Sequence, residues 1–269
     1  MSQPTTRPLA PATVRSLFAR PDAGPQSGEP RRARRTNPPG VPLSVWLGEP
    51  LSGCCPACEP PADAACAHRI PVTLAHRIVD AFSSRGDLVF VPEAGNASCL
   101  IAAVKSGRKV LAYAPSNHGA DLAYENLHTH AAQIASLAVL RRGRPGALPA
   151  APDAIASAQV AIVAPHNATT PGQLAALVSV SARALTPGGV LVVTTRQSSG
   201  QEAAGQLVAQ ARAAGLVYLQ HIVVAEGVVK EQQLPTAASH RSGCACHFPQ
   251  VNPGRHLLAH HDLLVFTKP

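Results

Sequence analysis

The chain has 269 residues, enough for one α/β domain of ordinary size with additional terminal segments. Hydrophobic residues make up 46% of it and aromatic residues only 3%, so the core must be built from alanine, valine and leucine. The formal net charge of +8 favours polyanions such as nucleic acid as partners. No apolar run approaches the roughly 18 residues of a membrane span, which excludes a membrane-spanning helix.

The N-terminal residues give an expectation about the compartment. Pro4, Pro8 and Pro11 interrupt any apolar signal core early in the chain, so we expect a cytoplasmic protein. In a reducing compartment, the seven cysteines predict thiols or metal ligands rather than a disulfide framework.

Residues 1–42 contain nine prolines and little apolar periodicity, and we predict that they form a disordered tail. Residues 1–50 hold seven arginines and three acidic residues, so +4 of the net charge lies at this end. Residues 31–35 (Arg-Arg-Ala-Arg-Arg) could contact phosphate groups, although a solubilising tail explains them equally well. Only half of the excess charge is left for the folded part, which gives little support for a basic binding face.

Residues 43–70 form a cysteine-rich entry segment whose first apolar cluster surrounds Trp46. Cys55 and Cys58 have the spacing of a zinc knuckle, and Cys66 and His68 could complete a tetrahedral zinc site. A second group that could fold back onto the first consists of Cys244, Cys246 and His247. A regular zinc ribbon has two C-x-x-C pairs and this chain has one, so unpaired thiols in loops are the alternative.

From residue 71 the hydrophobic pattern becomes regular. Apolar residues at helical spacing predict a helix over 71–82, and an apolar run predicts a strand over 88–91. A turn containing glycine leads to a helix over 98–106 and then to a strand over 110–114. This order is the opening βαβ unit of a doubly wound sheet, where ligands bind at the carboxyl end of the first strand.

The rest of the chain continues the alternation of strands and helices. Further helices are predicted over 120–132, 174–185 and 201–214, and further strands over 136–140, 160–164, 190–194, 217–224 and 263–266. Residues 141–153 hold three prolines and two glycines and are predicted to be a loop. We therefore predict an α/β fold with a doubly wound, mostly parallel seven-stranded sheet, helices on both faces and an antiparallel edge strand.

Three segments match one protein family in the right order. The helix over 71–82, residues 185–193 (Leu-Thr-Pro-Gly-Gly-Val-Leu-Val-Val) and residues 259–266 (Ala-His-His-Asp-Leu-Leu-Val-Phe) resemble the class I S-adenosylmethionine-dependent methyltransferases. The similarity is strongest to bacterial DNA methyltransferases that modify N4 of cytosine or N6 of adenine, and to related RNA enzymes. It covers about residues 68–269 and implies a Rossmann-like domain over 71–269, S-adenosylmethionine as cofactor, and DNA or RNA as partner.

The resemblance also implies cofactor-binding positions, and here the chain departs from the family. In the family the first strand ends on Asp-Pro, and a Gly-x-Gly-Thr turn follows. The positions implied to bind the cofactor are Val91, Glu93, Gly95, Asn96, Ser98 and Ala114. The family's acid is replaced by Val91 and its second turn glycine by Ala97, which is tolerable if φ of Ala97 is negative. The acid that binds the ribose hydroxyls is replaced by Ala114, and Glu93 could substitute for it from the turn.

The acceptor loop of the family follows the fourth strand and reads Asp/Asn/Ser-Pro-Pro-Tyr. Its first side chain and a proline carbonyl accept hydrogen bonds from the target amine, and its aromatic ring stacks on the flipped base. The resemblance therefore implies that Pro165, His166 and Asn167 hold the acceptor, with His166 stacking and Asn167 accepting.

These changes leave several hypotheses open. The first is an active methyltransferase whose catalysis is mostly proximity. The second is an inactive pseudo-methyltransferase that binds nucleic acid or protein, with salt-dependent affinity from the arginine-rich tail. The third is a structural protein stabilised by zinc on Cys55, Cys58, Cys66 and Cys244. A dehydrogenase is disfavoured because the chain has no Gly-x-Gly-x-x-Gly.

Overall fold

The computed structural model describes residues 43–48, 70, 72–95, 97–144, 156–165, 169–195, 203–226 and 260–269. Several sequence predictions lie outside these residues and stay predictions. They are the tail over 1–42, the zinc ligands Cys55, Cys58, Cys66 and His68, the group Cys244, Cys246 and His247, and the site residues Asn96, His166 and Asn167.

The described elements follow the predicted order closely. The strands are β1 (Leu43–Gly48), β2 (Leu88–Val91), β3 (Lys109–Ala114), β4 (Ala138–Arg142), β5 (Ala158–Val163), β6 (Leu185–Thr195), β7 (Val217–Glu226) and β8 (His260–Thr267). The helices are α1 (Val72–Phe82), α2 (Ser98–Lys105), α3 (Asn117–Ala131), the 3₁₀ helix η1 (Ala132–Leu137), α4 (Pro171–Ala184) and α5 (Ala203–Ala213). None of these helices combines the length and the apolar character that crossing a membrane requires.

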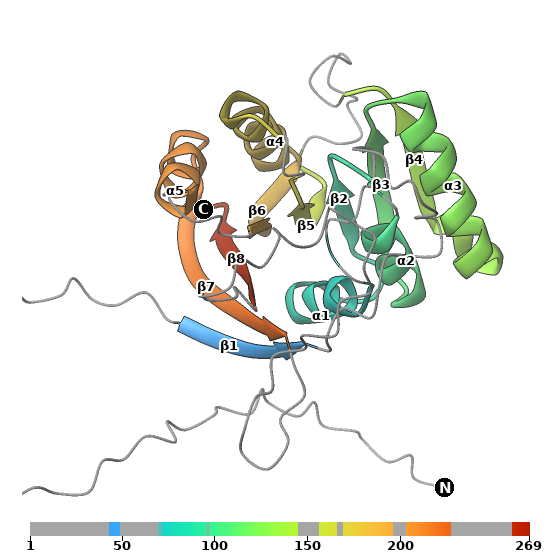
Figure 1. The fold of residues 1–269 in the computed structure, drawn as a ribbon, viewed down its shortest axis with the longest axis horizontal. Helices are drawn as coiled ribbons and strands as arrows, with labels where there is room; N and C mark the ends of the chain where they lie inside the picture. The colour runs from blue at the N-terminus through green and yellow to red at the C-terminus, as the bar shows by residue number, and fades with distance from the viewer. Residues whose placement is uncertain are drawn as a thin grey trace, which may run out of the picture. The chain divides into compact units, whose positions relative to one another are not determined.

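All eight strands belong to one sheet, in the order β1-β7-β8-β6-β5-β2-β3-β4 (Figure 1). Every neighbouring pair is parallel except the two pairs that β8 makes with β6 and β7. The predicted fold class is confirmed, with two refinements. The described sheet has eight strands rather than seven, and the antiparallel strand lies between β6 and β7 rather than at an edge. Residues 262–266 are all buried, as expected for a strand covered on both faces and paired on both sides.

The additional strand is β1, which pairs in parallel with the second half of β7, from Leu43 beside His221 to Gly48 beside Glu226. The Trp46 ring stacks on Phe82 of α1 with a centroid separation of 6.4 Å. The Arg77 guanidinium lies 4.5 Å from the centroid of the Trp46 ring, a cation–π contact. One aromatic residue, Trp46, therefore links β1 to α1, and the pairing of β1 with a strand far along the sequence is not visible in its own six residues.

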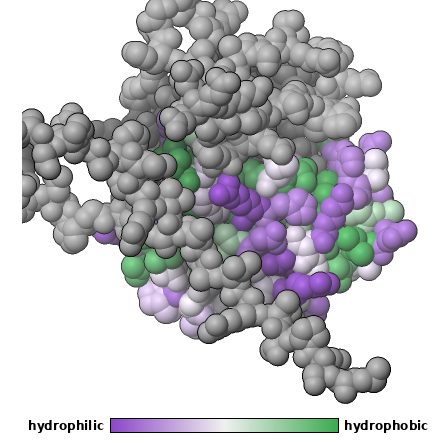
Figure 2. Space-filling view, turned by 90° about the horizontal axis from the view of Figure 1, so that it is seen from below, coloured by the Kyte–Doolittle hydropathy of each residue, from purple (hydrophilic) through white to green (hydrophobic). Residues whose placement is uncertain are grey.

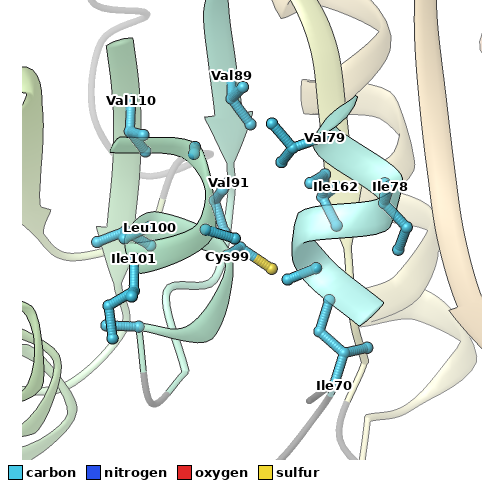
Figure 3. Packing of buried hydrophobic residues seen from close by; sticks show 14 of the residues in the cluster. Ile70, Ile78, Val79, Val89, Val91, Cys99, Leu100, Ile101, Val110 and Ile162 are labelled. Carbon is cyan, nitrogen blue, oxygen red and sulfur yellow. The ribbon is translucent and has the colours of Figure 1, made fainter. Parts of the chain in front are cut away.

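Two layers of helices cover the sheet, α1, α2 and α3 on one face and α4 and α5 on the other (Figure 1). In the first layer, α2 is buried at every residue from Ser98 to Val104, and it contains no aromatic residue. Figure 3 shows Val89, Val91 and Ile162 of the sheet beside α1 and α2, with the Cys99 sulfur pointing toward α1. Alanine and valine permit this close approach, as the low aromatic content predicted.

The amino edge of the sheet is closed by Arg108, whose side chain is buried although it is charged. Its Nη1 donates to Asp80 Oδ1 at 2.9 Å and to the Ser106 carbonyl at 2.7 Å. Its Nη2 donates to the Ser83 carbonyl at 2.7 Å, and its Nε donates to Ser83 Oγ at 3.2 Å. The guanidinium therefore ties the end of α1 to the turn between α2 and β3.

The surface is mixed in polarity where the described residues form it. Figure 2 shows hydrophilic residues in purple lying among smaller groups of hydrophobic residues in green, seen from below the view of Figure 1. Large apolar side chains that are exposed are Val45, Tyr124, Val139, Val217 and Leu219. They come from four different elements, and scattered exposed apolar residues of this kind are ordinary for a protein surface.

Candidate active site

The strand order marks one position at the carboxyl edge of the sheet. From β2 the chain proceeds outward through β3 to β4, and it then returns to add β5 on the other side of β2. In an open parallel sheet, the crevice outside the carboxyl ends at such a reversal is where ligands bind. The candidate site therefore lies at the ends of β2, β3 and β5, as predicted from the opening βαβ unit.

The turn between β2 and α2 folds over the end of β3. The Ala94 amide donates to the Tyr113 carbonyl at 2.7 Å, and the Ala97 amide donates to the Ala94 carbonyl at 3.0 Å. The first of these hydrogen bonds brings the half-buried residue Glu93 next to the last residues of β3. The Val91 side chain lies in the core instead (Figure 3), so only its backbone reaches the edge.

The backbone of this turn is left-handed at two residues, Gly95 with φ of 56° and Ala97 with φ of 68°. A negative φ at Ala97 was the condition for tolerating alanine there, and the structure overturns it. An alanine in the left-handed region costs about 1–2 kcal/mol, because its Cβ approaches the backbone carbonyl. The backbone of this turn thus has a positive φ at two residues, although only one of them, Gly95, is a glycine. The sequence reveals the residue type, but not the dihedral angle imposed by the packing around it.

Helix α2 begins at the candidate site with Ala97 as its N-cap residue, and no side chain caps it. The Ile101 amide donates to the Ala97 carbonyl at 2.8 Å, so the helix is regular from its first turn. The N-terminus of a helix carries partial positive charge and favours a carboxylate or phosphate. Ser98, the first helical residue, is buried at this end.

The end of β3 is apolar at Ala114, the position where the resemblance implies an acid that binds the ribose hydroxyls. Ala114 is 1% exposed, and its carbonyl accepts from the Gly143 amide at 2.8 Å. Helix α3 starts just beyond it, capped by Ser116, whose Oγ accepts from the Gly119 amide at 3.0 Å. A carboxylate at this point would have to come from another part of the chain, and the substitution by Glu93 stays a prediction.

The acceptor side is described only in part. Ala164 is buried and Pro165 is half-buried, directly after the end of β5. Strand β5 lies beside β2, with Val160 in register with Val89. The turn after β2 and the segment after β5 therefore emerge from adjacent strands, about 4.8 Å apart.

A group that the sequence analysis missed lies on β7 and β8. His221 Nε2 is 2.7 Å from Asp262 Oδ1, and His260 Nε2 is 3.7 Å from Asp262 Oδ2. Asp262 is 2% exposed overall. The burial of Tyr218, together with the negative charge of Asp262, raises the pKa of Tyr218. The available signal was an aspartate that follows two histidines and directly precedes the apolar run of residues 263–266. The sequence analysis used that run only as a family match.

No zinc site is visible in the part of the chain that the structure describes. No group of three or more histidine, cysteine or acidic side chains there is arranged to hold a metal ion. The predicted ligands Cys55, Cys58, Cys66 and His68 lie outside that part. Cys99, the cysteine that is described, is buried between α2 and α1.

The comparisons with known proteins concern the fold. No family model and no curated protein sequence matches this chain. A solved structure with a similar fold is the 1,6-didemethyltoxoflavin-N1-methyltransferase of Burkholderia thailandensis, with bound 1,6-didemethyltoxoflavin and S-adenosylhomocysteine. The TM-score is 0.51 and the identity 15%, over 73% of this chain and 77% of that chain.

Two further structures are similar at a lower TM-score of 0.49 and the same 15% identity. One is a TehB-like SAM-dependent methyltransferase from Corynebacterium glutamicum, with 74% of this chain and 89% of that chain covered. The other is the [4+2]-cyclase SpnF, with 75% of this chain and 83% of that chain covered.

Proposed function

We propose that this chain binds S-adenosylmethionine at the carboxyl edge of β2 and β3 and transfers its methyl group to a nitrogen atom of a base-like heterocycle, in DNA, RNA or a smaller molecule. The observation that carries the proposal is the left-handed turn at Gly95 and Ala97, positioned where the strand order reverses. A positive φ at both residues lets the backbone approach a ligand closely. The methyltransferase solved with S-adenosylhomocysteine has a similar fold, which supports this choice of cofactor.

The amino-acid end of such a cofactor suits the described residues. Its carboxylate would meet the N-terminus of α2, where the helix dipole and backbone amides favour negative charge. The backbone of Val91, Gly95 and Ser98 would border it, with Asn96 in the same turn. A cofactor of this kind supplies a methyl group on a positively charged sulfur.

The ribose end requires a substitute for the missing acid, and we assign that role to Glu93. The Ala94–Tyr113 hydrogen bond keeps Glu93 beside Ala114, the position from which an acid would bind two ribose hydroxyls. A carboxylate accepts two such hydrogen bonds wherever its chain originates, provided that both oxygens reach the diol.

The acceptor would lie over the end of β5, where Pro165 leads into the loop with His166 and Asn167. The buried Ala164 and the apolar end of β3 keep water away from this side. The contribution of the chain to catalysis would then be alignment of the nucleophilic nitrogen with the methyl group, an effect worth several kcal/mol when the geometry is right.

Calorimetric titration of S-adenosylhomocysteine into the full chain tests the proposal. We expect binding in the micromolar range that Gly95→Val abolishes, because valine cannot adopt φ of 56° without strain. Gly172→Val is the matched control, since Gly172 lies in α4 and a Cβ added there would have no atom within 4 Å, and this variant should bind normally. The absence of heat and of thermal stabilisation at millimolar ligand would contradict the proposal.

A second function is favoured by the strained Ala97 together with the apolar Ala114, which are the changes expected in a pocket that has lost its cofactor. In that case the fold is a binding module for nucleic acid. Retention on DNA without cofactor, measured over a salt gradient, distinguishes the two functions. Replacing the four arginines of residues 31–35 by alanine should then lower the salt dependence.

A further inference from the structure

Asp262 lies on the acceptor side of the proposed site, two strands from the end of β5. On β6, Thr195 is in register with Asp262, and Val193 is in register with Val163 of β5. Continuing this register by two residues brings Pro165, Thr195 and Asp262 to the same level. Two strand spacings of about 4.8 Å separate the backbones of Pro165 and Asp262 by roughly 10 Å.

These residues also share a face of the sheet. Leu264 and Phe266 of β8 pack in the layer with α4 and α5, and so does Val163 of β5. Because side chains alternate along a strand, Asp262 and Pro165 belong to the same face as these three residues. The carboxylate and the acceptor segment therefore border one surface rather than opposite sides of the sheet.

Among the residues that the structure describes, one oxygen of this carboxylate has no hydrogen-bond partner. The Asp262 side chain is 3% exposed, and its Oδ1 is paired with His221. Oδ2 is buried and makes no hydrogen bond, because His260 Nε2 at 3.7 Å is too distant. An unsatisfied buried carboxylate oxygen costs free energy and calls for an explanation. The two imidazoles beside the carboxylate, those of His221 and His260, are 28% and 32% exposed.

We propose that Asp262 Oδ2 binds an N–H group of the acceptor, so that the acceptor carries a cationic or amidine-like nitrogen edge that extends from the Pro165 segment toward Asp262, over a backbone separation of roughly 10 Å. This inference rests on the proposed function. The substrate class that it implies is a flat nitrogen heterocycle whose N–H donors lie at the end near Asp262. A carboxylate offers only acceptor sites, so it selects donors and repels anions. Discrimination of this kind is strong because a ligand without the N–H leaves the buried oxygen unpaired.

A role of His221 as general base in the methyl transfer does not fit the same geometry. His221 is on β7, three strands from β5, which corresponds to about 14 Å. A general base must be within hydrogen-bond distance of the proton that it removes. The pair is therefore a binding group, in which His221 positions the carboxylate through Oδ1.

The experiment uses the full chain with and without saturating S-adenosylhomocysteine, and benzamidine as the probe, with benzoate as the control of opposite charge. Binding is followed by NMR through the ring protons of the histidines. We expect benzamidine to bind in the millimolar range with nuclear Overhauser contacts to His221 and His260, and benzoate to give none. Asp262→Asn should lower the affinity for benzamidine about tenfold or more and leave the affinity for S-adenosylhomocysteine unchanged.

Each outcome bears on one proposal. Equal affinity of benzamidine for wild type and Asp262→Asn overturns the inference, and so do contacts to other parts of the chain. If the variant does not fold, the contacts in the wild-type protein decide alone. If S-adenosylhomocysteine does not bind but benzamidine contacts both histidines, the proposed function fails while the Asp262 site stands.

Discussion

The two edges of the sheet are built on opposite principles. At the amino edge, Arg108 satisfies two carbonyls, a carboxylate and a hydroxyl, and little is left unpaired. At the carboxyl edge, an alanine has a left-handed backbone, a helix starts without a side-chain cap, and a buried carboxylate oxygen makes no hydrogen bond to the described residues. Strain and unsatisfied groups persist where a ligand can relieve them. The stabilising contacts of Arg108 therefore lie at one edge, and the site that we propose lies at the other.

The largest expected effect comes from breaking the amino edge. Arg108→Ala removes four hydrogen bonds that the charged guanidinium donates. The carbonyls of Ser83 and Ser106 then lose this donor. We expect the free energy of unfolding to fall by roughly 3 kcal/mol, measured by urea denaturation. Arg212→Ala, on the exposed face of α5, is the control and should change it by less than about 0.5 kcal/mol. Equal losses in both variants would show that the amino edge is not the stabilising one.

The next effect measures the strain at the carboxyl edge. Ala97 and Ala102 are both fully buried, but only Ala97 has a positive φ. Ala102→Gly loses a buried methyl group and helix propensity, together about 2 kcal/mol. Ala97→Gly loses the same methyl group but relieves about 1–2 kcal/mol of strain, so its stability should stay near that of the wild type. Equal destabilisation of the two variants would show that the turn is not strained.

A smaller effect tests which acid serves the ribose. Glu93→Gln should lower the affinity for S-adenosylhomocysteine about tenfold, which corresponds to the loss of one hydrogen bond to a charged group. Adding Ala114→Asp to this variant places a carboxylate at the end of β3 and should recover most of the affinity. An unchanged affinity in Glu93→Gln, measured by calorimetry, would remove Glu93 from the site.

The smallest effect concerns pH at the amino edge. Burial lowers the pKa of His76, partly opposed by Asp80, and His76 Nδ1 lies 3.1 Å from Ser106 Oγ. A lowered pKa means that the unfolded chain binds the proton more readily, so stability falls as pH decreases below about 6.5. His76→Gln should reduce this loss between pH 7 and pH 5.5 in urea titrations. An identical pH profile for the variant would exclude His76 as a contributor.

The regular part of the fold was predictable because its signal is local. Strands of four to six apolar residues between amphipathic helices determine a doubly wound sheet, and turn glycines such as Gly95 and Gly107 mark the ends. Strand β1 escaped prediction because the strand that it pairs with, β7, is far along the sequence. The insertion of β8 inside the sheet likewise depends on pairing with two strands at once.

The site was predictable only as a location. Its position follows from the strand order, but φ of Ala97 and the pairing of His221 with Asp262 depend on tertiary packing. An isolated aspartate in an apolar strand was visible in the sequence. Its pairing could not be predicted, because the partner His221 is on β7, 41 residues away in the sequence.

The pairing of β1 with β7 also has a kinetic consequence. Leu43 pairs with His221, so forming this contact closes a loop that contains most of the domain and carries a large entropy cost until that part is ordered. We expect β1 to dock last during folding and its amides to exchange through a local opening that leaves the other strands intact. The chain contains one tryptophan, Trp46, in this strand. Its fluorescence therefore reports the final step of folding alone, and stopped-flow refolding should show it lagging behind the recovery of helical circular dichroism.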